Sequence, residues 1–223
     1  MITSPHPGGK GAPPPETFAS PRRRLQLDRL RAALARRPGR PAPAPPGVRR
    51  ASVALLLRPA PADVELLLIK RAERVGDPWS GHMALPGGRS EPGDADAAAT
   101  AVRETREEVG IDLDAVGTRL GSLDELAPLS GAPRILVAPF VFAVPGAAEA
   151  VPNAEVEAAV WIPLGELAHP GAATEHLLET VTGDPRSFPA IGARGYVIWG
   201  LTHRILADFM EVALPLLHPE DGR

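Results

Sequence analysis

A glycine turn followed directly by an acid-rich segment constrains this chain more than any other feature. Residues 86–94 read PGGRSEPGD, and residues 95–111 continue as ADAAATAVRETREEVGI. On a helix, Glu104 and Glu108 are four residues apart, so their carboxylates stand one turn above each other with Glu107 beside them. The sequence therefore predicts three carboxylates on one patch of a single helix.

The same segment carries the pattern of a helix with one buried face. Ala98, Val102, Thr105 and Val109 follow the i, i+4, i+7, i+11 spacing of a buried stripe. We predict a helix over residues 95–109, with the side chain of Asp94 as its N-terminal cap. Such a stripe would hold the helix against a core.

Three carboxylates on one patch repel each other, and a hard divalent cation would offset that repulsion. Magnesium prefers oxygen ligands and keeps several waters and substrate phosphates. The predicted ligands are Glu104 and Glu108, with Glu107 binding directly or through water, and Mn²⁺ is the alternative metal. Arg103 stands four residues before Glu107 and can hold that carboxylate in place. Taken alone, the acidic segment over residues 103–108 would be explained by a solvated helix face, but the preceding glycine turn favours a metal site.

The composition indicates one globular domain with extensions. The chain has 223 residues, 44% hydrophobic and 23% charged, and no cysteine, which excludes disulfides, thiolate metal sites and cysteine nucleophiles. No stretch approaches the roughly 20 apolar residues that span a bilayer. P-loop, HExxH and G-x-S-x-G motifs are absent. We expect a cytoplasmic protein that binds neither membrane nor nucleic acid.

The first 47 residues differ from the rest of the chain in charge and proline content. They hold nine Lys and Arg against Glu16 and Asp28, together with eleven prolines. A basic tail can meet an anionic surface, although a solvated, arginine-rich segment explains the same composition. Residues 1–21 are predicted to be disordered.

A short helix is predicted within this region. Leu27, Leu30 and Leu34 have helical spacing, which favours a helix over residues 24–37. The predicted division of the chain is an N-terminal extension over residues 1–47, a globular domain over 48–217 and a C-terminal tail over 218–223.

Short apolar runs and turns alternate along the globular part. Strands are predicted over residues 51–57, 64–70, 83–85, 121–126, 135–144 and 156–162. Further helices are predicted over residues 164–168 and 196–217, with 169–190 as a loop. Trp161 and Trp199 lie in apolar runs and are expected in the core. Because no regular βαβ repeat is present, we predict an α/β (α+β) fold whose mixed sheet is flanked by helices.

Residues 88–111 resemble the Nudix box, G-x5-E-x7-R-E-U-x-E-E-x-G-U, in which U is bulky and aliphatic. Gly88 begins the pattern, and Asp94 stands where the family usually has Glu. Eight residues rather than seven separate Asp94 from Arg103, and Thr105 occupies a usually aliphatic position. The matching positions are Arg103, Glu104, Glu107, Glu108, Gly110 and Ile111. The resemblance implies an α/β/α sandwich with a mixed sheet and pyrophosphohydrolase activity.

The resemblance covers roughly residues 50–210 and is closest to the Nudix branch that hydrolyses coenzyme A. That branch has the same extra residue in its box. It usually carries a segment resembling L-R-x-H-x-G-Q-V-S-F-P-G-G before the box, whereas residues 76–88 here read GDPWSGHMALPGG. Trp79 stands at the His position and His82 at the Gln position. The resemblance therefore supports the reaction class for this chain more directly than it supports coenzyme A as the substrate.

The resemblance also implies a metal site. Glu104 and Glu108 would bind Mg²⁺ or Mn²⁺, Glu107 would help, and Gly88 would offer a backbone carbonyl. The metal would bridge the diphosphate, offset its charge and lower the pKa of a bound water.

Other residues are candidates for catalysis and substrate binding. Glu155 is a candidate general base or extra ligand, and a loop surface charge is the equal alternative. Arg103 would orient Glu107. Arg71 can grip phosphates or be solvated, Trp79 can stack on a base or anchor the packing, and His82 can contact substrate or end a strand.

Three functions follow from these residues. The first is cleavage of coenzyme A or acyl-coenzyme A. The second is the same chemistry on another nucleoside diphosphate derivative, such as ADP-ribose. The third is a non-catalytic Nudix-fold protein that binds a nucleotide or a partner. Because Glu104, Glu107 and Glu108 of the box are all present, we prefer the hydrolysis of a nucleoside diphosphate derivative. A homodimer is possible, since Nudix enzymes are often dimers.

Overall fold

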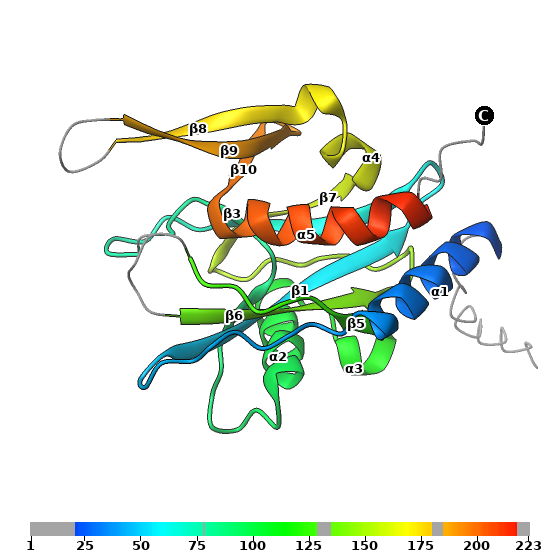
Figure 1. Cartoon of the computed structure of the whole chain (residues 1–223), viewed down its shortest axis with the longest axis horizontal. Helices are drawn as coiled ribbons and strands as arrows, with labels where there is room; N and C mark the ends of the chain where they lie inside the picture. The colour runs from blue at the N-terminus through cyan, green and yellow to red at the C-terminus, as the bar shows by residue number, and fades with distance from the viewer. Residues whose placement is uncertain (1–20, 78, 129–134, 180–184, 218–223) are drawn as a thin grey trace, which may run out of the picture.

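Two β-sheets organise the chain. The computed structural model describes residues 21–77, 79–128, 135–179 and 185–217. Figure 1 shows a larger mixed sheet with helices on both faces and a smaller antiparallel sheet beside it. This arrangement confirms the predicted α+β class with a mixed sheet. The predicted tail over 218–223 and nearly all of the segment predicted to be disordered lie outside the described residues.

The larger sheet is built around β1 (Arg49–Pro59). It pairs antiparallel with β2 (Val64–Arg71) and β4 (Gly87–Arg89) but parallel with β6 (Ile135–Ala143), so the sheet is mixed. The remaining strands are β3 (Met83–Ala84) and β7 (Val156–Pro163), which pair with β2, and β5 (Thr118–Ser122), which pairs with β6.

The strand predicted over residues 121–126 lies earlier than expected. β5 begins at Thr118, and Leu126 forms only an isolated bridge to Val137. Thr118 and Arg119 are exposed, so the start of β5 has no apolar pattern that the sequence could reveal.

Each face of the larger sheet carries its own apolar core. Alternation along β1 sends Leu55 and Leu57 into one core and Ala54 and Leu56 into the other. α1 (Pro21–Arg36) and α5 (Gly200–Leu217) pack on the first core, and α2 (Ala97–Val109) and α3 (Leu113–Val116) on the second. Figure 1 shows α5 and α2 on opposite sides of the sheet. Within the described residues, no helix is both long and apolar enough to cross a bilayer.

The helix predicted over residues 24–37 is present as α1, which begins three residues earlier, at Pro21, and packs on the first core. Leu27, Leu30 and Leu34 are buried there. The buried Gln26 donates its Nε2 hydrogen to the carbonyl oxygen of Leu217, 2.6 Å away, which ties α1 to the end of α5.

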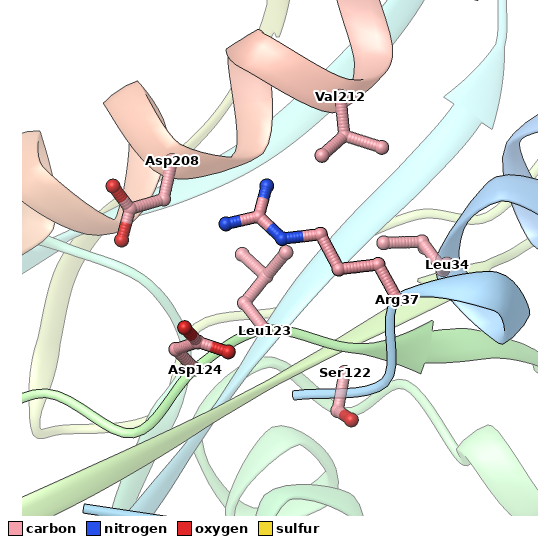
Figure 2. Close-up of a pocket in the computed structure, with 7 residues that line it drawn as sticks. All are labelled: Leu34, Arg37, Ser122, Leu123, Asp124, Asp208 and Val212. Atoms are coloured by element: carbon pink, nitrogen blue, oxygen red, sulfur yellow. The ribbon is translucent and has the colours of Figure 1, made fainter. Parts of the chain in front are cut away.

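A small pocket of about 20 Å³ lies where the end of α1 meets β5 and α5. Figure 2 shows the guanidinium of Arg37 directed toward Asp208 and Asp124 in this pocket. None of the predicted site residues lines it.

Leu30→Ala is expected to lower the free energy of unfolding by about 3 kcal/mol, because it leaves a cavity under a fully buried helix residue. Leu25→Ala is the matched control on the same helix, since Leu25 is 51% exposed and its truncation should change stability by less than about 0.5 kcal/mol. Urea unfolding of the two variants measures both effects. Equal stabilities would contradict the packing of α1.

The smaller sheet overturns the loop predicted over residues 169–190. After α4 (Leu164–Leu167), which was predicted, come the 3₁₀ turn η1 (Pro170–Ala172) and strands β8 (Ala173–Glu179), β9 (Pro185–Ala193) and β10 (Tyr196–Trp199). Most described residues of β8 and β9 are exposed, so these strands lack the apolar runs from which a strand is recognised.

The helix predicted over residues 196–217 was wrong at its start. Residues 196–199 form β10, and the helix begins at Gly200. Arg194 and Gly195 both have positive φ, at 52° and 80°, and form the two-residue turn that joins β9 to β10 as a hairpin. Pro215 lies inside α5.

Candidate active site

The acid-rich helix α2 begins two residues later than predicted. Asp96, not Asp94, caps it, because the Asp96 carboxylate accepts a hydrogen bond from the amide of Ala99 at 2.8 Å. Gly110 ends the helix with φ of 69°, a conformation that favours glycine. The predicted buried stripe is present, although Val102 is only half-buried.

Asp94 is engaged elsewhere, which is why it does not cap the helix. Its nearly buried carboxylate accepts hydrogen bonds from the Arg103 Nε at 3.0 Å, the Thr100 hydroxyl at 2.8 Å and the Glu91 amide at 2.8 Å. The bond from Arg103 is the main cause that holds the pKa of Asp94 well below its usual range. Asp94 therefore closes the turn before α2 and fixes Arg103.

Arg103 joins the glycine turn to the acidic helix. Its Nη1 lies 2.9 Å from Glu104 Oε1 and 3.0 Å from Glu107 Oε2, and its Nη2 donates to the carbonyl of Arg89 at 2.9 Å. The expected Arg103–Glu107 pair is present, and the contacts to Asp94, Glu104 and Arg89 are additional. The pKa of Arg103 is raised, chiefly by its hydrogen bond to Asp94.

Arg103→Gln is expected to lower the free energy of unfolding at pH 7 by about 2 kcal/mol, because it removes charge-assisted hydrogen bonds from a nearly buried Asp94. Since the folded pKa of Asp94 is depressed, its contribution is present above the unfolded pKa near 3.8 and is lost as the pH falls below it. Thermal melts from pH 7 to pH 3 should therefore show the gap between wild type and Arg103→Gln constant down to about pH 4 and beginning to narrow below it, with most of the gap still present at pH 3. The exposed Arg106→Gln is the control, and a pH-independent gap would contradict this role.

Glu108 is a buried carboxylate with little compensation. It is 3% exposed, and its Oε2 accepts a hydrogen bond from the amide of Gly87 at 2.8 Å. Among the described residues, no lysine or arginine forms an ion pair with it. Burial, followed by the charges of Glu104 and Glu155, raises the pKa of Glu108 to about 7, while Gly87 and Arg71 act in the opposite direction.

Glu104 lies against the glycine turn. A Cβ on Gly88 would come within 2.5 Å of the Glu104 carboxylate, so a larger residue at this position would displace that carboxylate from the turn. Burial is the first cause that raises the pKa of Glu104, and the charges of Glu107 and Glu155 raise it further. The glycine turn thus lies against both inner carboxylates, with Gly88 beside Glu104 and Gly87 bonded to Glu108.

Glu155 reaches this site from a loop tied to the end of α2. The amides of Val151 and Asn153 donate to the carbonyl oxygens of Val109 and Glu108, at 2.8 and 2.9 Å. The Glu155 side chain is 52% exposed and lies 3.0 Å from Arg74 Nη2. Its charge acts on both Glu104 and Glu108, so the loop adds a fourth carboxylate to the neighbourhood.

Glu107 stands apart from the two inner carboxylates. Its side chain is 54% exposed, and it is linked to Glu104 through the shared Nη1 of Arg103. Within the described parts of the chain, no three His, Asp or Glu side chains are placed so as to hold a metal ion on their own. The excess negative charge around the half-buried Glu104 and buried Glu108 nevertheless fits a cation that also takes water and phosphate oxygens.

Arg71 connects the carboxylates to the residues before the turn. Its Nη2 binds Asp77 at 2.8 Å, and its buried Nε–H has no hydrogen-bond partner among the described residues. Its charge acts on both Glu108 and His82, and its amide donates to the His82 carbonyl at 3.0 Å. Arg71 is therefore close to both groups.

Trp79 and His82 contact groups other than the acidic helix. Trp79 is half-buried and packs against the first core, which agrees with the packing alternative. The His82 ring meets Trp199 edge-on, 4.8 Å between ring centroids. Burial lowers the pKa of His82, and the charge of His176 lowers it further.

A cleft of about 980 Å³ runs along another side of α2. Arg103 and Glu107 reach its wall, but Glu104 and Glu108 are not among its described lining residues. The remaining wall includes Ala98, Val102, Arg106, Arg119 and Phe142.

Asp94, Gly87 and Trp199 lie at the site but were not predicted as site residues, since Asp94 was expected to cap the helix and Trp199 to lie in the core. Asp94 holds Arg103, the Gly87 amide holds Glu108, and Trp199, expected in the core, is half-buried against His82. The Asp at a usual Glu position of the box was the one available signal.

Comparison with known proteins places these residues in a family context. The model of the "NUDIX domain" family matches residues 48–180. A Schizosaccharomyces pombe protein with the name "Uncharacterized protein C14C4.10c" is 39% identical over 129 residues, covering 56% of this chain and 39% of that protein. "Uncharacterized Nudix hydrolase NudL" of Yersinia pestis is 37% identical over 121 residues, covering 53% of this chain and 57% of that protein.

A solved structure is similar over more of the chain. The "MutT/nudix family protein from Enterococcus faecalis" aligns with a TM-score of 0.50 and 18% identity, covering 91% of this chain and 81% of that one. At this identity the likeness concerns the fold alone. The sequence matches, by contrast, span only about half the length of the relatives or less.

Proposed function

This chain belongs to the NUDIX domain family, and from that membership we propose that it is a divalent-metal-dependent pyrophosphohydrolase. Its substrate would be a nucleoside diphosphate linked to another moiety. The observation that carries the proposal is the pairing of Glu104 and Glu108 against Gly87 and Gly88. Both carboxylates lose solvent there and, among the described residues, a single ion pair, Arg103 with Glu104, offsets their two charges.

The donor set of this site suits Mg²⁺ or Mn²⁺. Glu104 and Glu108 would hold the ion, with Glu107 acting through water and Gly88 through its carbonyl oxygen. When bound, the ion would offset the charge of the diphosphate and lower the pKa of a water. The raised pKa values of Glu104 and Glu108 support this role, because a cation would favour the charged form that burial disfavours.

The protein's own residues would position the substrate and move the proton. Arg103 would keep Glu104 and Glu107 oriented, since one of its nitrogens contacts both carboxylates. Arg71 would bind a phosphate oxygen, which its unpaired Nε–H supports. Glu155 would accept the proton from the attacking water, because it is accessible and its charge acts on both inner carboxylates.

Coenzyme A or acyl-coenzyme A is the first substrate candidate, and ADP-ribose or another nucleotide derivative is the second. The extra residue in the box favours the first, whereas Trp79 and His82 depart from the coenzyme A segment. The third hypothesis is a non-catalytic binding protein, and the presence of Glu104, Glu107 and Glu108 weighs against it.

We further propose that residues 48–217 form the catalytic domain and that the enzyme acts in the cytoplasm as a homodimer. The family match begins at residue 48, which supports the domain boundary. The dimer rests on the resemblance to Nudix enzymes, and size-exclusion chromatography with light scattering tests it.

A substrate panel tests the proposed function. The purified full chain is incubated with Mg²⁺ and, separately, with coenzyme A, ADP-ribose, NADH, diadenosine polyphosphates and nucleoside triphosphates, and products are identified by mass spectrometry. Release of phosphopantetheine and an adenosine bisphosphate would assign the coenzyme A reading. Selective cleavage of another compound would keep the chemistry and change the substrate. No turnover with either Mg²⁺ or Mn²⁺ would support the binding protein.

A further inference from the structure

Four aromatic rings gather around Trp199 of the smaller sheet. The ring cluster consists of His82, His176, Phe188 and Trp199. His176 stacks on Trp199 with 4.0 Å between centroids and 22° between planes, and Phe188 tilts toward Trp199 at 5.8 Å. His82 meets Trp199 edge-on at 4.8 Å.

The smaller sheet places three of these rings on one face. His176 on β8 lies opposite Phe188 on β9, and Trp199 on β10 lies opposite Ala190, two residues after Phe188. Opposite and alternate residues share a face of a sheet, so these rings form a continuous row. Each ring of the cluster is neither buried nor fully exposed, so the row reaches the protein surface.

Short connections join the ring cluster to the proposed catalytic site. Arg71 binds the His82 backbone and acts electrostatically on both His82 and Glu108. The Thr202 hydroxyl at the start of α5 donates to the carbonyl of Met83 at 3.1 Å, which fixes β10 and α5 beside β3. A substrate whose diphosphate lies between Glu108 and Arg71 can therefore extend toward the rings.

From this geometry, and resting on the proposed function, we infer that the ring cluster is the subsite for the nucleobase of the substrate. Aromatic rings stack on the faces of bases, and purines offer the larger face. His82 and His176 also present ring nitrogens that can exchange hydrogen bonds with the edge of a base. A purely apolar ligand would offer those nitrogens no hydrogen-bond partner. The cluster would thus bind the base while Arg71 and the carboxylates act on the diphosphate.

Ligands with and without a base test this inference. Isothermal titration calorimetry of the full chain compares adenosine 5′-monophosphate with ribose 5-phosphate. The two ligands share the sugar and the phosphate, and only the first carries a base. We expect the wild type to bind the nucleotide at least about tenfold more tightly. His176→Leu should remove this preference, and His176→Phe, which keeps a ring, should retain most of it. Leu177→Ala is the matched control at the next, 66% exposed position of β8.

His176 is chosen because replacing Trp199, which contacts all three other rings, could disturb the fold. In turnover assays, His176→Leu should raise KM about tenfold and leave kcat within about threefold. Equal affinity for the two ligands in the wild type, or unchanged preference in His176→Leu, would overturn the subsite. Loss of the preference in Leu177→Ala as well would also overturn it, because the effect would then not belong to the rings. Failure of the proposed hydrolysis would appear separately, as absence of turnover in a wild type that still prefers the nucleotide.

Discussion

Replacing Glu108 by Gln is expected to reduce kcat about a thousandfold while the protein remains folded. The substitution removes a charge that would hold the divalent cation, and losses of this order accompany removal of a group acting directly on the reacting centre. The amide keeps an oxygen that can accept the Gly87 hydrogen bond, so the local geometry should survive. Steady-state kinetics with Mg²⁺ measures the loss, and Glu211→Gln on the exposed side of α5 is the control.

The pH dependence of the stability of Glu108→Gln distinguishes loss of the Glu108 charge from loss of folding. Because the folded pKa of Glu108 is raised to about 7 from 4.5, the stability it contributes is full below pH 4.5 and is lost as the pH rises through 7. In metal-free buffer with chelator, the wild type should therefore lose stability relative to Glu108→Gln between pH 4.5 and 7. A variant that is both inactive and unfolded would contradict the proposed role, as would an active one.

Glu155→Gln is expected to lower kcat about a hundredfold, because a positioned carboxylate would no longer accept the proton of the attacking water. Glu157→Gln provides a closely matched control. Glu155 and Glu157 are 52% and 47% exposed, and each is paired with one cation, Arg74 and Lys70 respectively. Removal of either charge thus costs a similar surface ion pair, but only Glu155 acts on Glu104 and Glu108.

The pH dependence of kcat distinguishes the two explanations for Glu155. A general base should produce an acidic limb in the wild type that flattens in Glu155→Gln and persists in Glu157→Gln. If the two variants behave alike, Glu155 is a surface charge of the loop and the proton acceptor lies elsewhere.

Local spacing allowed the centre of the site to be predicted from the sequence. The positions of Glu104, Glu107 and Glu108 relative to one another depend only on helix geometry, and the apolar stripe of α2 fixes which face meets the sheet. The mixed sheet could likewise be predicted, because β1, β2, β6 and β7 have apolar runs that end at turns.

Tertiary contacts decided what the sequence could not reveal. Asp94 has the chemistry of a helix cap, and only the folded turn shows that its carboxylate is occupied by Arg103 and Thr100. β8 and β9 are largely exposed, so they have no apolar run from which a strand could be predicted. The ring cluster depends on bringing His82 to residues of the smaller sheet about a hundred positions later, a pairing that no local pattern encodes.

Hydrolysis in ¹⁸O-labelled water tests the central claim most directly. The full chain, Mg²⁺ and the best substrate of the panel are combined, and the products are examined by mass spectrometry. Attack of water on phosphorus predicts one ¹⁸O atom in one of the two phosphate products, no reaction with chelator, and no detectable label with Glu108→Gln on the same time scale. Turnover that continues in chelator, or products without label in either phosphate, would contradict hydrolysis of a diphosphate at this acidic helix.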